Sequence, residues 1–326
     1  MELRELAEQL SGGSLYVRTA LAGAHMGQIA VGKTEEDFAG WARVAPPERL
    51  PATVSGVFCE RMSSRRELIL CGGGHISKPV CALGHMLGYA VTVIDDRPEF
   101  ANRARFPQAQ RVLCLPFAQA LAELPADASY VIVTRGHQDD AACLARILQV
   151  PFAYCGMIGS KTKVAAVMQR MRALGYTQRQ LDAVHSPIGL KIGAHTPEEI
   201  AVSIAAELIA VNSVRETSLF PDDIVQQLRH NAGRMVMAAI VRREGSAPRG
   251  AGARMLVTED GGCFGTIGGG PVEHAAQARA RALMGGAPEL QQYELGGGEA
   301  SHLGMVCGGR VTVLFTPIAA RAEGDG

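Results

Sequence analysis

The sequence predicts an α/β protein built around a parallel β-sheet. Short apolar runs of strand length alternate with helical stretches between residues 66 and 175, and this alternation is typical of parallel sheets with right-handed crossovers. The chain of 326 residues also holds 38 glycines, which gather beside apolar runs rather than in linkers. In a parallel sheet such glycine turns mark a ligand site beyond the carboxyl ends of the strands.

The first predicted strand, RELILC at residues 66–71, runs into the glycine turn GGGHIS and then into a helix. The next strand, AVTVID, ends on Asp95. This order is that of a dinucleotide-binding βαβ unit, and Gly72 and Gly74 fit its fingerprint, although Ser77 stands where the third glycine is expected. Asp95 would then accept a hydrogen bond from the 2′-hydroxyl of NAD. The alternative is a turn that has kept the fold and lost the nucleotide.

Three further strand–helix pairs follow, and polar residues come after each strand, where a ligand would lie. Ser160 is an expected helix N-cap, and Thr196 with Glu199 forms a capping box that predicts another helix start. His137 and His185 lack the close spacing of a metal site, so a polar core or capping role is expected. The candidate cofactor contacts in this half are Gly72, Gly74, His75, Asp95, Gly156, Gly159 and Ser160.

Three glycine-rich motifs follow: EGSAPRGAGARM at 244–255, GTIGGGPVEHA at 265–275 and MVCGGRV at 305–311. Glycines before Pro271 predict a sharp turn into a helix, with N–H groups pointing outward at a positive terminus that suits an anion. Arginine forks match phosphate geometry. Glu273 would be a ligand contact or would simply complement the helix dipole. The candidate contacts here are Ser246, Arg249, Arg254, Gly268, Gly269, Gly270, Glu273 and Gly308.

The composition is that of an ordinary globular protein: 47% hydrophobic and 20% charged residues, with 32 basic against 32 acidic side chains. This balance gives no electrostatic footprint for nucleic acid or an anionic membrane. No apolar run is long enough to span a bilayer and the N-terminus does not resemble a signal peptide, so a cytoplasmic protein is expected. The cysteines stand singly, which argues against a zinc site or disulfide framework, and most are expected in the core.

The three C-terminal motifs resemble the XdhC/CoxI family of xanthine dehydrogenase accessory proteins. The segments GGGH, DDRPEF, TRGHQDD, YCGMIGSK, HSPIGLKIGA and TPEEIAVSI resemble the Rossmann-type domain of the same family. Together the matches cover about residues 65–318. One position departs from the pattern, because Pro271 stands where the family commonly has a cysteine. Cys307, beside two glycines and near Arg310, is then the candidate sulfur-handling thiol.

The resemblance implies a Rossmann-type domain over 65–215 and a smaller α/β XdhC/CoxI-type module over 219–318, with a tail at 319–326. The family commonly places the module before the Rossmann-type domain, whereas here it follows. Residues 1–64 are interpreted as an N-terminal segment, a candidate rearranged part of the module.

For function, the resemblance implies an accessory factor, rather than an enzyme with turnover of its own. Such a factor binds molybdenum cofactor (molybdopterin), supports its sulfuration and inserts it into a xanthine dehydrogenase-type enzyme. A cysteine desulfurase is the candidate sulfur donor, and a homodimer is expected. Two alternatives stay open. One is an NAD(P)-dependent oxidoreductase of a small substrate, with His137 or His75 as acid–base residue, and the other is a ligand-free scaffold for client enzymes.

Overall fold

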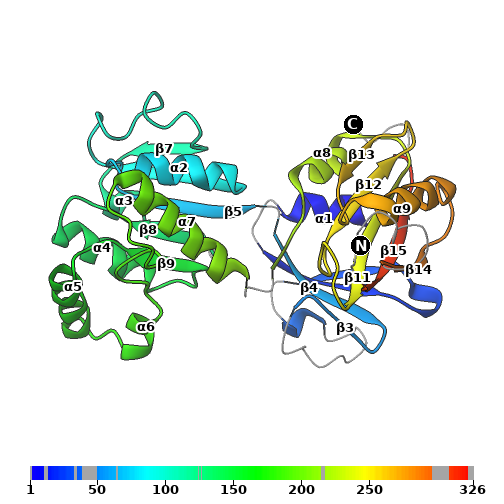
Figure 1. Ribbon diagram of the computed structural model, residues 1–326, viewed down its shortest axis with the longest axis horizontal. Coiled ribbons are helices and arrows are strands. Elements are labelled where there is room, and N and C mark those ends of the chain that lie inside the picture. The colour runs from blue at the N-terminus through cyan, green and yellow to red at the C-terminus, as the bar shows by residue number, and fades with distance from the viewer. Residues whose placement is uncertain are drawn as a thin grey trace. The chain divides into compact units, whose positions relative to one another are not determined.

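The structure, a computed structural model, describes residues 2–10, 14–32, 35–38, 50–63, 65–123, 125, 127–213, 217–295 and 308–321. The chain forms two compact units, one made of Met1–Ser64 with Glu216–Gly326 and the other of Arg65–Arg215. The second unit is therefore inserted into the chain of the first (Figure 1). We call Arg65–Arg215 the inserted unit and the remainder the discontinuous unit. No helix among the described residues is long and apolar enough to cross a membrane.

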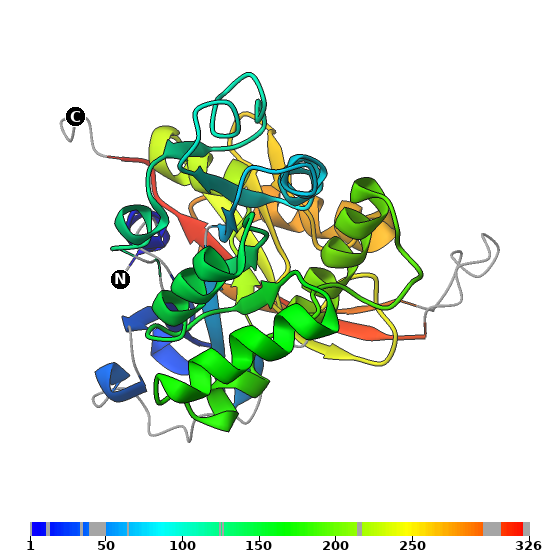
Figure 2. The ribbon, with the colours of Figure 1, turned by 90° about the vertical axis from the view of Figure 1, so that its left-hand side faces the viewer.

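The inserted unit is a parallel five-stranded sheet with helices on both faces (Figures 1 and 2). Its strand order is β7-β6-β5-β8-β9, so the first strand lies in the middle and the chain reverses direction across the sheet there. This is the Rossmann order, whose ligand crevice lies at that reversal. The strands are β5 (Arg66–Cys71), β6 (Tyr89–Asp95), β7 (Arg111–Cys114), β8 (Ser129–Ile132) and β9 (Tyr154–Met157). The helices are α2 (Ser77–Met86), α3 (Phe117–Ala120), α4 (His137–Ile147), α5 (Lys161–Ala173), α6 (Gln178–Asp182) and α7 (Pro197–Ser213).

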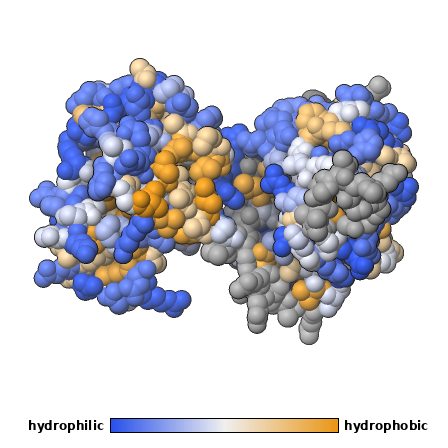
Figure 3. Space-filling model, in the orientation of Figure 1, coloured by the Kyte–Doolittle hydropathy of each residue, from blue (hydrophilic) through white to orange (hydrophobic). Residues whose placement is uncertain are grey.

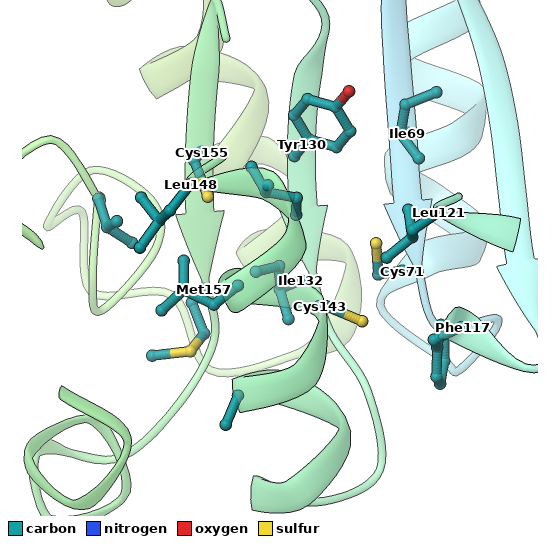
Figure 4. Packing of buried hydrophobic residues seen from close by; sticks show 14 of the residues in the cluster. Ile69, Cys71, Phe117, Leu121, Tyr130, Ile132, Cys143, Leu148, Cys155 and Met157 are labelled. Carbon is teal, nitrogen blue, oxygen red and sulfur yellow. The ribbon is translucent and has the colours of Figure 1, made fainter. Parts of the chain in front are cut away.

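Strand alternation divides the core of the inserted unit between the two faces of the sheet. Leu68 and Leu70 of β5 pack in one buried cluster, while Ile69 and Cys71 pack in another with residues of α4 and α5 (Figure 4). Successive strand residues point to opposite faces, so a continuous apolar run such as RELILC can fill both layers. Gly84 of α2 permits close packing, because a Cβ there would lie 2.6 Å from Leu68 Cδ2.

Two helix starts expected from capping signals are confirmed. The Lys163 N–H donates to Ser160 Oγ (3.2 Å) at the start of α5. At α7 the Glu199 N–H donates to Thr196 Oγ1 (3.2 Å) and the Thr196 N–H donates to Glu199 Oε2 (3.1 Å). Figure 3 shows apolar side chains gathered on the surface over α7, where Val202 and Ile209 are about half exposed.

The discontinuous unit contains two five-stranded sheets. In one, the order is β10-β4-β1-β2 with β3 also paired to β4. The other is antiparallel, with order β13-β12-β11-β15-β14. The first sheet uses β1 (Leu15–Ala20), β2 (Ile29–Gly32), β3 (Ala52–Val54), β4 (Val57–Ser63) and β10 (Thr217–Leu219). The second uses β11 (Met235–Glu244), β12 (Arg254–Thr258), β13 (Cys263–Gly265), β14 (Glu289–Glu294) and β15 (Arg310–Ile318). The helical elements are α1 (Leu3–Gln9), η2 (Gly23–His25), η3 (Glu35–Phe38), α8 (Asp222–His230) and α9 (Gly270–Ala282).

Residues from both ends of the chain build the discontinuous unit together. The buried Arg4 guanidinium of α1 donates to the carbonyl oxygens of Leu228 (3.2 Å), Gly233 (2.9 Å) and Ala319 (3.2 Å). Strand β10 pairs in parallel with β4 from the N-terminal segment. Residues 1–64 thus share a core and a sheet with the C-terminal residues; their interpretation as a rearranged piece of the module stays a prediction.

Candidate functional site

Two glycine turns are expected to approach a ligand, and the first follows β5 in the centre of the inserted unit's sheet. Gly72 has φ +114°, and a Cβ there would lie 2.4 Å from the Val133 carbonyl oxygen. Only glycine fits this position without moving backbone atoms. Gly74 differs, since no atom of any described residue lies within 4 Å of a Cβ built on it.

Asp95, the expected ribose contact, has both carboxylate oxygens engaged within the protein. It is 2% exposed, and its Oδ2 accepts the Gly73 N–H (2.8 Å) and Arg97 Nη2–H (3.0 Å). Its Oδ1 accepts the backbone N–H (3.1 Å) and Nε–H (2.8 Å) of Arg97. Burial alone would raise the pKa of Asp95, but the hydrogen bonds from Arg97 and Gly73 hold that pKa below its usual value. A ribose hydroxyl would have to displace these partners.

Gly73 and the Gly72 carbonyl of the first turn are also covered. A Cβ on Gly73 would lie 2.3 Å from the Phe100 carbonyl oxygen, and Arg105 Nε–H donates to the Gly73 carbonyl oxygen (2.9 Å). The hydroxyl of Ser77 donates to the Gly72 carbonyl oxygen. Ser77, at the position of the expected third glycine, is thus buried and bonded to the backbone of the turn. The ribose contact that the fingerprint implies is therefore filled by Gly73 and Arg97, whereas Gly74, the glycine that would let the backbone approach a pyrophosphate, has no described neighbour.

The other candidates of the inserted unit lie in different surroundings. His75 and Ser160 are exposed, but Gly156 is buried, and a Cβ there would lie 2.3 Å from the Tyr154 hydroxyl. Gly159 packs against the side chain of Lys163. Gly156 thus serves packing within the core and is not open to a ligand.

Two polar contacts beside this sheet involve carboxylates that the sequence did not single out. Glu207 of α7 accepts hydrogen bonds from the Tyr154 hydroxyl and the Gly189 N–H (2.9 Å), and lies 3.2 Å from His185 Nδ1. Asp140 is fully buried and pairs with Lys163. A charged residue on the buried face of a predicted helix is the signal that could have found both. No group of three or more His, Cys, Asp or Glu side chains among the described residues could hold a metal ion.

The second turn, Thr266–Gly270, enters α9 as its sequence predicts. Gly268, Gly269 and Gly270 have φ values of 131°, 74° and 67°, and Pro271 stands in the first helical turn. Three successive residues in this region require glycine. No atom of the described residues lies within 4 Å of a Cβ built on Gly269 or Gly270, so the described part of the chain leaves the space beside both open.

Several backbone N–H groups of this turn, which were expected to point outward to a ligand, instead donate to acceptors within the protein. Glu273 Oε2 accepts the N–H groups of Ile267 (3.0 Å) and Gly269 (3.0 Å) and the hydroxyl of Thr266. The Gly268 N–H donates to Thr266 Oγ1 (3.1 Å). Burial alone would raise the pKa of Glu273, but these hydrogen bonds hold it below its usual value. The carboxylate of Glu273 thus occupies amides that an anion was expected to meet.

The structure brings all three glycine-rich motifs together. A Cβ on Gly268 would lie 3.3 Å from Pro248 Cβ and 3.6 Å from Arg249 Cγ. A Cβ on Gly309 would lie 2.0 Å from the Ser246 carbonyl oxygen, and one on Gly245 would lie 3.2 Å from the Gly308 carbonyl oxygen. The loop that starts at β11 therefore touches the turn before α9 and the glycines before β15. Ser246, Arg249 and Gly308 are exposed there.

The two arginines of this loop have opposite environments. Arg249 is exposed, and among the described residues none pairs with its guanidinium. Arg254 is 3% exposed, donates to Glu60 of β4 and to the Gly252 carbonyl oxygen (2.6 Å), and lies 5.2 Å from the centre of the Phe220 ring. Arg254 is thus part of a buried ion pair, and the expectation that it flanks a turn met by ligand is corrected. A charged Glu60 inside the apolar run VSGVFCERM was the available signal.

Cys307 lies outside the described residues. Two other thiols, Cys114 and Cys263, are exposed, although they were expected in the core. Each lies on a strand at the edge of its sheet, β7 or β13, where no described strand pairs on one side. The Arg281 guanidinium lies 3.9 Å from the Cys263 sulfur. The remaining described cysteines are buried: Cys59, Cys71, Cys81, Cys143 and Cys155.

Comparison with known families places one match in each unit. The model of the XdhC Rossmann domain matches residues 68–208, and that of the XdhC and CoxI family matches residues 228–294. The matches thus fall on the parallel sheet with the first glycine turn and on the elements that carry the second.

Curated relatives and a solved structure resemble the same chain. A protein of Bacillus subtilis (strain 168), described as a probable subunit of xanthine dehydrogenase, is 31% identical over 186 residues, which are 53% of this chain and 54% of the relative. The uncharacterized protein YqeB of Escherichia coli (strain K12) is 26% identical over 200 residues, 61% of this chain and 36% of YqeB. A crystal structure of a xanthine dehydrogenase from Bacillus halodurans has a TM-score of 0.50 and 26% identity, covering 63% of this chain and 64% of that one. The chain therefore spans less than two thirds of the length of each of these relatives.

Proposed function

The chain belongs to the XdhC and CoxI family, and on this premise we propose that it is an accessory factor that binds molybdenum cofactor. In this proposal it also supports sulfuration of the cofactor and its insertion into a xanthine dehydrogenase-type enzyme. The Bacillus subtilis relative, with its description as a probable part of xanthine dehydrogenase, supports this class of client. We also propose that the chain forms a homodimer and that a cysteine desulfurase donates the sulfur.

The convergence of the three glycine-rich motifs in the discontinuous unit carries the proposal. It gathers an exposed arginine, an exposed serine and open glycines in one place: Arg249, Ser246, Gly269 and Gly270. When bound, molybdopterin supplies a phosphate and a centre of sulfur chemistry. The Arg249 guanidinium has no partner among the described residues, so a phosphate could bind it without breaking an ion pair with any of them. Arg249 would therefore hold the phosphate, with the Ser246 hydroxyl as a second donor.

The sulfur part of the proposal rests on Cys307, which immediately precedes Gly308 in the third motif. Gly308 is exposed and contacts the loop that carries Arg249. A thiol in this segment is therefore proposed to lie near the cofactor. Cys307→Ser should leave cofactor binding intact and abolish activation of a client enzyme, because serine cannot carry reactive sulfur.

The direct test is titration of the full chain with molybdenum cofactor. Arg249→Ala should weaken binding by about 1–3 kcal/mol, the range for a charge-assisted hydrogen bond in a binding site. Arg234→Ala is the matched control, because it removes an exposed arginine of the same unit that is paired with Glu259. Equal affinities for the wild type and Arg249→Ala would remove Arg249 from the site. A wild type that binds no cofactor would overturn the proposal.

An NAD(P)-dependent oxidoreductase stays the alternative function, and its site would be the turn at Gly72–Gly74. The internal partners of Asp95 and Gly73 weigh against it. Calorimetry with NAD and NADP would decide the matter. Measurable binding that is lost in Asp95→Ala would favour the oxidoreductase, and binding of neither nucleotide nor pterin would favour a ligand-free scaffold.

A further inference from the structure

The carboxylate of Glu273 is bound inside the loop that precedes its own helix. Its Oε2 accepts hydrogen bonds from the Thr266 hydroxyl at the start of the loop, from the Ile267 N–H, and from the Gly269 N–H at the end (3.0 Å for each N–H). One oxygen thus ties both ends of a five-residue loop to the first turns of α9. This arrangement exceeds what compensation of a helix dipole requires, since dipole compensation needs no particular donor.

The loop needs such an organiser because it contains three successive glycines. Gly268, Gly269 and Gly270 all have positive φ, and glycine has more conformations to lose than any other residue when it is ordered. Packing holds the first part of the loop, where Ile267 is buried in a hydrophobic cluster and Gly268 lies against Pro248 and Arg249. Among the residues that the structure describes, none places an atom within 4 Å of a Cβ built on Gly269 or Gly270, so none of these residues packs on the last two glycines.

The charge of Glu273 would by itself repel an anionic ligand. Its engaged oxygen faces three hydrogen-bond donors, and two of them are backbone amides of the loop. A carboxylate that accepts several N–H bonds has much of its charge compensated locally. Glu273 can therefore shape a site for a phosphate that the Arg249 guanidinium would recognise.

We propose that Glu273 is a positioning residue of the cofactor site: it holds Thr266–Gly270 in the one conformation that seats Gly268 against Arg249 and leaves Gly269 and Gly270 open to ligand. This rests on the proposed function above, because the ligand is the phosphorylated pterin. Glu273 itself does not touch the ligand. Its effect on affinity passes through the shape of the loop.

The experiment compares Glu273→Ala and Glu273→Gln in the full chain by two measurements. The first is hydrogen exchange at the Ile267 and Gly269 amides without ligand, and the second is affinity for molybdenum cofactor. In Glu273→Ala both amides lose their acceptor, so the hydrogen-exchange rates of these amides should rise about tenfold or more. The affinity of the chain for molybdenum cofactor should fall about tenfold. Glu273→Gln keeps a side chain of the same length with an acceptor oxygen, so it should bring the exchange rates and the affinity most of the way back to the wild-type values. Glu259→Ala is the control, because Glu259 also accepts a backbone N–H, that of Arg234, at an exposed turn of the same unit.

Each outcome decides between positioning and other roles. Unchanged exchange in Glu273→Ala would overturn the proposal, and so would faster exchange with wild-type affinity, because the ligand would then not use the ordered loop. If Glu273→Gln shows wild-type exchange rates but still binds the cofactor weakly, Glu273 contacts the ligand directly instead. A wild type that binds no cofactor would overturn the proposed function itself, and the wild-type titration reports that separately from the exchange data.

Discussion

The two glycine turns of this protein look alike in sequence and differ in accessibility. The turn at Gly72–Gly74 follows a central strand and precedes α2, and the turn at Gly268–Gly270 precedes α9. In each, a carboxylate from a neighbouring element accepts an N–H of the turn: Asp95 in the first and Glu273 in the second. Both turns are therefore ordered by internal hydrogen bonds, but only the second leaves successive glycines open.

The difference arises from the segments that pack on each turn. The Phe100 carbonyl and the Arg105 guanidinium cover Gly73, whereas no described residue packs beside Gly269 and Gly270. A glycine-rich motif therefore shows where the backbone bends sharply. Whether a ligand can reach the bend depends on a segment elsewhere in the chain.

The largest expected effect separates the two arginines beside the open turn. Arg254→Ala should lower the free energy of unfolding by about 3–5 kcal/mol, because it leaves the Glu60 carboxylate buried without its partner. Arg249→Ala removes an exposed side chain and should change the free energy of unfolding by less than about 0.5 kcal/mol. Urea unfolding of both variants checks this, and equal stabilities would show that Arg254 is not held in the core.

The next prediction makes the same chemical change in both turns. Gly72→Ala should lower the free energy of unfolding by about 2–5 kcal/mol, because the new Cβ would stand on a residue with positive φ and would clash with the Val133 carbonyl. Gly270→Ala meets no described residue, so it should lower the stability only through its positive φ, by about 1–2 kcal/mol. Thermal unfolding monitored separately for each unit measures both. A larger loss for Gly270→Ala would reverse our assignment of closed and open turns.

A smaller effect is expected from the charge of Asp95, and it should depend on pH. The pKa of Asp95 is lowered in the folded protein, so its carboxylate stabilises the fold at pH values above the unfolded pKa of about 3.9. Asp95→Asn should therefore cost about 1.5–3 kcal/mol at neutral pH. The difference from wild type should shrink as pH falls below about 4, through the lowered folded pKa. A constant difference between pH 7 and pH 3 would show that the charge of Asp95 does not contribute.

The smallest effect concerns thiol reactivity and leaves stability unchanged. Timed alkylation with peptide mapping should label Cys114 and Cys263 well before the buried thiols, such as Cys81, whose pKa burial raises to about 11. Cys307 should react at least as fast as these two exposed thiols if it is an accessible sulfur-handling residue. Labelling of Cys307 at the rate of Cys81 would place it in the core and end the sulfur proposal.

Much of the fold could be predicted from local pattern. Continuous apolar runs alternating with helices predicted the parallel sheet, and capping residues such as Ser160 and Thr196 predicted helix starts that the structure confirms. The glycines before Pro271 predicted the turn into α9. These features follow from backbone sterics and hydrogen bonding within a few residues, so the sequence carries them directly.

The site could be predicted only as a set of separate motifs. The sequence alone determined the residue types of the candidate site. These are glycines at sharp backbone turns, arginines that suit a phosphate, and carboxylates near each turn. The tertiary structure decided which of these face solvent. It buried Arg254 against Glu60, nearly two hundred positions earlier in the chain, and closed the Rossmann turn with Phe100 and Arg105. It also brought Ser246, Arg249 and Gly308 to one place. Burial and ion pairing depend on distant segments meeting in space, and short-range patterns in a single sequence do not record which segments meet.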